Sequence, residues 1–173
     1  LEEAGLIMRR GHPPDALYSF KHVMIQNAAH ASLLHSERRK LHASIAQVLV
    51  EMYPEKTDRE PELLAHHLTE SGQSEGAASF WLKAGKQAAR SGANLEAIGH
   101  LRRGLGVVQA NARMQGADEM ELELRIALGN VLIAAKGYAV QEVEENYIRA
   151  LELGQQLDDE ENAFAATRGL WVC

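Results

Sequence analysis

The sequence predicts a mostly α-helical protein, a tetratricopeptide-like α-solenoid of helical hairpins preceded by a short β-hairpin. Two observations lead to this fold class. Apolar residues recur at helical spacing from residue 23 to the end of the chain. All four prolines fall before residue 62, and Pro13 and Pro14 stand together between two short runs. The chain has 173 residues, of which 46% are hydrophobic, and this apolar content is typical of a folded domain.

The β-hairpin is predicted from the first of these regions. Leu6–Arg10 and Leu17–His22 are short strand-like runs, and residues 11–15 between them carry the glycine and prolines of a turn. In the second run apolar and polar residues alternate, which is the period of a half-buried strand.

Eight helices follow, and their ends are predicted from capping residues, prolines and glycines. Residues able to cap a first turn are Ser36, Ser74, Asn94 and Asp118, the last with Glu121 three residues on. Pro54 closes the second helix, whereas Pro61 suits a first turn. Lys136 and Gly137 suit a helix end. The expected helices span residues 23–34, 36–53, 61–71, 74–91, 94–108, 118–136, 140–157 and 160–172.

Small and bulky residues recur at spacings that match the tetratricopeptide pattern, in which small residues let two helices cross closely. The pattern fits residues 64–84, 84–104 and 128–150, the last with about two extra residues between the helices. The first two matches overlap on one helix, so we take the second as the true repeat and the earlier helix, at 61–71, as a capping or divergent unit. A generic helical bundle is the alternative.

Charge is unevenly distributed along the chain. The net charge is −6, but residues 81–113 carry +5 and residues 118–161 carry −9. Such segregation suits an extended peptide, a partner domain or head-to-tail self-association, and the acidic total argues against a nucleic-acid protein. No apolar run approaches the ~20 residues that span a bilayer. Cys173 is the single cysteine, which excludes a disulfide framework and favours a cytoplasmic location.

Several phrases together resemble one region of large bacterial signalling proteins. These phrases are Tyr18–Leu34, Pro61–Gly72, Asn94–Leu105 and Leu128–Tyr138. The proteins they resemble join a class III adenylate or guanylate cyclase domain, or a LuxR-type regulator, to a STAND-class AAA-like ATPase and a tetratricopeptide array.

The resemblance implies a fragment, as does a chain that begins at Leu1 rather than methionine. Residues 1–35 would end the winged-helix subdomain of the ATPase, with the hairpin as its wing. Residues 36–58 would be a connecting helix and linker. Residues 59–173 would be the repeats, truncated within a helix. We expect that truncated end, around Leu170 and Trp171, to be disordered or buried against a neighbour, which includes a second copy of the chain.

The sequence predicts no catalytic residues and no metal or cofactor site, so the chain is not expected to be an enzyme. The string around Lys86 lacks the first glycine and the hydroxyl of a P-loop. His66 and His67 point about 100° apart on a helix and cannot both bind one metal ion. His30, His35 and His42 have no metal-binding partner one turn away. ATP or ADP belongs only to the longer parent.

His22 is the candidate for nucleotide sensing in that parent. In STAND ATPases a winged-helix histidine contacts the β-phosphate of ADP, and Phe20–Ile25 resembles the phrase that carries it. An imidazole at a strand-to-helix junction can donate to a phosphate oxygen. The alternative is a half-buried histidine with no role beyond the helix start.

The second candidate site is the groove of the repeats, which in tetratricopeptide arrays binds a partner peptide. Its expected residues are His66, Lys86, Arg90 and Asn130. We therefore expect a non-catalytic interaction module that regulates cyclic-nucleotide synthesis or transcription through the ATPase. The alternatives are solvated helix faces at this groove and, for the chain, a DNA-binding regulator segment acting through the wing residues Arg9, Arg10 and Lys21.

Overall fold

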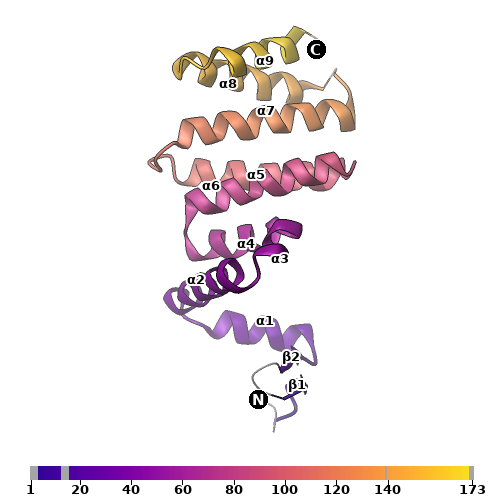
Figure 1. The fold of residues 1–173 in the computed structure, drawn as a ribbon, viewed down its shortest axis with the longest axis vertical. Helices are drawn as coiled ribbons and strands as arrows, with labels where there is room; N and C mark the ends of the chain where they lie inside the picture. Colours follow the sequence, from indigo (N-terminus) through magenta and orange to yellow (C-terminus); the bar gives the residue numbers. More distant parts are fainter. Residues whose placement is uncertain (1–3, 13–15, 139, 172–173) are drawn as a thin grey trace. The chain divides into compact units, whose positions relative to one another are not determined.

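The computed structural model describes residues 4–12, 16–138 and 140–171, and it is mostly helical with one small antiparallel sheet (Figure 1). The mostly α-helical class predicted from the sequence is confirmed. The chain divides into two compact units, Leu1–Leu41 and His42–Cys173. Within the described ranges, no helix is long and apolar enough to cross a membrane.

The first unit contains the predicted hairpin. Strand β1 (Ile7–Arg10) pairs antiparallel with β2 (Leu17–Phe20), so that Ile7 lies opposite Phe20. The predicted turn residues 13–15 lie outside the described residues. The expectation of a half-buried strand is wrong, because every residue of β2 is exposed. Each face of a two-stranded ribbon needs a covering element to become buried.

Helix α1 (Val23–Ser32) follows the hairpin, and eight further helices follow α1 in the described part of the chain. They are α2 (His35–Met52), α3 (Pro54–Arg59), α4 (Pro61–Ser71), α5 (Ser74–Arg90), α6 (Asn94–Ala110), α7 (Ala117–Lys136), α8 (Gln141–Gln156) and α9 (Glu160–Trp171). Helix α3 was not predicted, since Pro54 was interpreted only as an end. Pro54 also begins α3, where its missing N–H costs nothing. This short helix packs on α4, and Lys83 of α5 donates to Asp58 at 2.5 Å.

The predicted N-caps are wrong by one or two residues. Ser36 lies inside α2, Ser74 and Asn94 are the first residues of their helices, and Asp118 is the second residue of α7. No cap side chain forms a cap hydrogen bond at α5, α6 or α7. Acidic residues in these first turns supply the favourable charge instead. The predicted end of α7 is confirmed, because Gly137 follows Lys136 with a φ of 83°.

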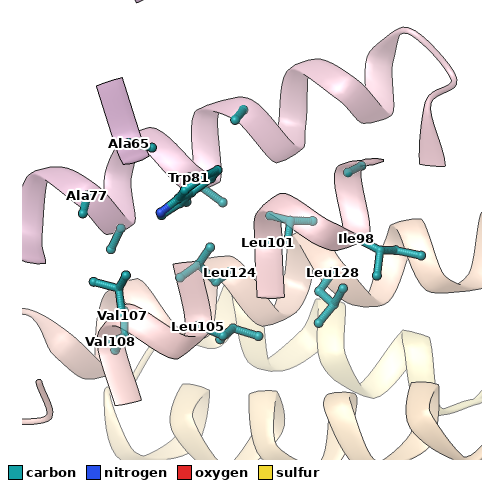
Figure 2. Packing of buried hydrophobic residues seen from close by; sticks show 14 of the residues in the cluster. Ala65, Ala77, Trp81, Ile98, Leu101, Leu105, Val107, Val108, Leu124 and Leu128 are labelled. Carbon is teal, nitrogen blue, oxygen red and sulfur yellow. The ribbon is translucent and has the colours of Figure 1, made fainter. Parts of the chain in front are cut away.

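In the second unit, consecutive helices from α4 onward pack on one another, and α5 also contacts α7, as α7 contacts α9 (Figure 1). These three helices begin at residues 74, 117 and 160, which are 43 residues apart. Helix α6 packs on α5 and α7, and α8 packs on α7 and α9. Figure 2 shows the buried side chains between these helices, with Trp81 and Leu101 near the centre and Leu124 and Leu128 from α7. The second unit therefore contains a layer of α5, α7 and α9.

Two glycines set how closely the paired helices approach. A Cβ atom on Gly85 would lie 2.5 Å from Leu101 Cγ, and one on Gly129 would overlap Cζ of the Tyr147 ring. Both pairs lie within the second and third matches to the repeat pattern, residues 84–104 and 128–150. Since the interior is close-packed, neither position has room for a side chain.

Replacing Gly129 tests this packing. Gly129→Ala should lower the free energy of unfolding by about 1–3 kcal/mol, because the added methyl overlaps the Tyr147 ring. Gly99→Ala is the matched control, since nothing lies within 4 Å of its added Cβ in α6. That control should be neutral or stabilise by up to about 1 kcal/mol through helix propensity. Chemical denaturation followed by circular dichroism measures both, and equal stability of the two variants would contradict the packing argument.

Candidate functional site: a groove on helices α5, α7 and α9

A hollow of about 500 Å³ lies over the layer of α5, α7 and α9. It brings together three of the predicted groove residues, Lys86, Arg90 and Asn130, from two helices that are far apart in sequence. Its remaining lining residues are Gly85, Ala89, Leu101, Glu123, Ile126, Ala127, Val131, Glu161 and Asn162. We call this hollow the α5–α7–α9 groove.

The cationic side of the groove is formed by α5. Lys86 and Arg90 are one turn apart, so both side chains project from the same face. The ammonium group of Lys86 lies 3.4 Å from Glu123 Oε2 on α7. Arg90 is exposed and has no ion-pair partner within residues 4–12, 16–138 and 140–171. Arg90 is therefore the cation of this groove that is available to a ligand.

Asn130 on α7 is fixed by the core. The buried Tyr147 of α8 donates its phenolic hydroxyl to Asn130 Oδ1 at 2.9 Å. The amide nitrogen of Asn130 makes no hydrogen bond with the described residues. Because the oxygen is held by Tyr147, the two N–H groups are oriented donors at the surface of the groove.

The floor is apolar and the far side is acidic. Ile126 and Ala127 of α7 are half-buried in the floor, and Glu161 and Asn162 belong to α9. Asn162 donates its backbone and side-chain N–H groups to Asp159 at 3.0 and 2.7 Å, and these bonds lower the pKa of that carboxyl. The groove is therefore bipolar, with cations on α5 and an acid on α9.

Some of the charged residues of the basic and acidic segments form ion pairs with each other within the second unit. Glu142 on α8 accepts from Lys136 at 2.7 Å and also pairs with Arg102 of α6. The buried Glu121 pairs with Arg125 at 2.7 Å. The basic and acidic segments thus contact each other in the fold, which sequence reasoning interpreted only as a signal for outside partners.

His22 lies at the strand-to-helix junction that the sequence predicts. It stands between β2 and α1, its side chain is exposed, and its carbonyl oxygen accepts from the backbone N–H groups of Ile25 and Gln26. Arg9, Arg10 and Lys21 of the hairpin line one hollow of about 620 Å³.

His66 does not line the α5–α7–α9 groove. It lies on α4 beside His67, and both rings contact that of His42 from α2. The sequence indicates no partner for His42. In the structure its ring contacts that of His67, which lies 25 residues further along the chain. Among the described side chains, no group of three His, Cys, Asp or Glu residues is arranged to hold a metal ion.

Comparisons with known proteins find one distant similarity of note. The chain is 24% identical over 172 residues to an uncharacterized protein of Rhizobium meliloti (strain 1021). The match covers 98% of the chain and 17% of that protein, so the chain spans about one sixth of the relative's length. No protein-family profile matches the chain, and no solved structure matches it.

The Glu142 ion pairs predict a pH dependence. Hydrogen bonds from Lys136 and then Arg102 lower the pKa of Glu142 below its ordinary 4.5. The unfolded chain therefore takes up the proton first, and this stabilisation is lost as the pH falls below 4.5. Glu142→Gln should lower the free energy of unfolding by up to about 1 kcal/mol at neutral pH. It should also make the free energy of unfolding fall less steeply as the pH decreases below 4.5.

Chemical denaturation at a series of pH values from 7 to 3 measures this difference. Glu144→Gln is the control, because it removes a carboxylate of the same helix that has no ion pair in the described ranges. A Glu142→Gln curve that runs parallel to the wild-type curve would contradict the proposed linkage.

Proposed function

We propose that the chain is a non-catalytic protein-interaction module that binds an extended segment of a partner in the α5–α7–α9 groove. The observation that supports this most directly is the convergence of Lys86, Arg90 and Asn130 around one apolar floor. Arg90 offers an unpaired guanidinium and Asn130 offers fixed donors. An apolar floor with a few oriented polar groups is what peptide and small-ligand sites share.

The groove selects for the chemistry of its ligand. A carboxylate of the partner can accept from Arg90 and can displace Glu123 from Lys86, since that pair is long and exposed. Backbone carbonyl groups can accept from Asn130. Aliphatic side chains can cover Ile126 and Ala127. The partner segment is therefore acidic and aliphatic, and a basic residue at its other end would meet Glu161.

The repeat architecture belongs to this proposal. The α5–α6 and α7–α8 hairpins, with glycines beneath Leu101 and Tyr147, are compatible with a tetratricopeptide-like solenoid. Their spacing of 43 residues departs from the standard spacing of about 34, so longer helices form each pair. The ligand face of such arrays is the layer of first helices, which here corresponds to α5, α7 and α9.

The place of the module in a longer protein is also a proposal. The resemblance to bacterial STAND ATPases linked to cyclase or LuxR-type output supports a cytoplasmic signalling role. The Rhizobium relative is far longer than this chain, which agrees with a place for the module within a longer protein. In that context the exposed His22 would sense ADP. Slower ADP release in the full-length wild type than in a His22→Ala variant is the expected outcome, and equal rates would exclude that role.

Peptide binding tests the groove. The probe is a fluorescein-labelled peptide of glutamate, leucine and alanine, and the measurement is fluorescence anisotropy. Arg90→Glu should weaken binding about tenfold to a hundredfold, because a hydrogen bond to a charged group contributes about 1.5–3 kcal/mol. Arg113→Glu makes the same change of charge at an exposed site outside the groove and is the matched control. Equal weakening by both substitutions would show unspecific attraction and contradict the proposal.

The DNA-binding alternative is a separate arm of the same experiment. A labelled 20-base-pair duplex replaces the peptide, and the salt concentration is varied. Binding that falls steeply with salt and is abolished by Arg10→Glu with Lys21→Glu would favour the hairpin as a DNA contact. Peptide binding that depends on Arg90, with no salt-dependent duplex binding, favours the groove.

A further inference from the structure

Three histidines form a cluster between α2 and α4 within the second unit. The ring centroids of His42 and His67 lie 5.0 Å apart, those of His66 and His67 lie 5.3 Å apart, and those of His42 and His66 lie 5.6 Å apart. His42 is 7% exposed, and His67 is half-buried. Imidazoles titrate near neutral pH, so three in mutual contact couple their protonation to the packing of the two helices.

The contact between His42 and His67 limits how many protons the pair can hold. Their Nδ1 atoms lie 2.9 Å apart, which is a hydrogen bond between two ring nitrogens. Such a bond needs one N–H group and one lone pair. An imidazolium has protons on both nitrogens and donates only. The bond therefore survives with no positive charge or one, and it breaks when both rings are protonated.

The surroundings of the pair add to this limit. Desolvation by burial is the largest effect on His67 and lowers its pKa, and the neighbouring His42 and His66 lower it further. Glu70, one turn on along α4, is the charged group that raises it. Apart from Glu70, the groups around His67 thus favour its neutral form.

Few apolar side chains of the described part of α2 join the core of the second unit. Ala46 and Leu49 are buried, and Ile45 is partly buried against the core. Ala43 and Val50 of α2 line a hollow of about 460 Å³ together with Leu68 and Gln73. Helix α2 also exposes large apolar residues such as Val48 and Met52. The histidine pair is therefore added to a small apolar contact.

We propose that the His42–His67 pair is a pH-sensitive latch, which holds residues 42–52 against α4 at neutral pH and releases them in acid, once both rings are protonated. Acid protonates both rings, the Nδ1–Nδ1 hydrogen bond breaks, and the two cations repel each other within 5.0 Å. Release uncovers the face of α4 that carries His66 and His67. The neutral pair re-forms when the pH rises, so the change is reversible.

Distance measurement between two spin labels tests the latch in the full chain. Val48→Cys on α2 and Ser79→Cys on α5 carry the labels in a Cys173→Ser background, and the native side chains at both label sites are exposed. At pH 7.5 we expect one narrow distance distribution, and at pH 4.5 a broad distribution at longer distance. His67→Asn should remain narrow at both pH values, because asparagine keeps a donor and an acceptor and does not titrate. His35→Asn, at an exposed histidine of the same helix as His42, is the control and should behave as the wild type.

An unchanged wild-type distribution at pH 4.5, or equal broadening in His67→Asn, would overturn the proposal. If His67→Asn is already broad at pH 7.5, nuclear magnetic resonance titration of the wild-type ring protons decides the question. Coupled two-step curves for His42 and His67, with the lower step at least about one unit below the upper, support the latch. Independent single-step curves at the ordinary value for histidine overturn it.

Discussion

The structure of the second unit depends on the close crossing of helices at glycine. Gly129 lets α7 and α8 approach until the Tyr147 ring lies where a side chain of α7 would otherwise be. The same ring also occupies the position that a side chain on Gly169 of α9 would fill. One aromatic side chain thereby sets the spacing of three helices, and its hydroxyl group holds Asn130 in the groove. The geometry of the candidate site is a consequence of core packing.

Electrostatics connects the same helices at their surface. The basic residues of α5 and α6 meet acidic residues of α7 and α8, as in the pairs Lys86–Glu123 and Arg102–Glu142. Pairs that are this exposed contribute little stability individually. These pairs nevertheless determine which positively charged side chains remain available to a partner. Lys86 is partly neutralised, whereas Arg90 lies one turn further along α5 and keeps its full charge within the described structure.

The histidines of the chain divide by environment. His22 is exposed between β2 and α1. His42 and His67 are brought together by the folding of α2 onto α4, and their hydrogen bond couples two helices. From their spacing along α4, His66 and His67 are expected not to bind one metal ion together. The spacing of residues along α4 gives no information about the third ring, that of His42, which belongs to α2 and lies 25 residues before His67.

The sequence by itself determined the local structure: the hairpin, the helical periods and the end of α7 at Gly137. These features depend on interactions between residues that are close along the chain. Tertiary structure decided the contacts between separate elements. It added α3, which packs on α4, shifted the helix starts, placed Leu101 against Gly85 and Tyr147 against Gly129, paired the charged segments with each other and brought Asn130 into one groove with Arg90. The physical reason is that burial and pairing depend on which helices meet, and that is set by packing across the whole second unit rather than by neighbours in the chain.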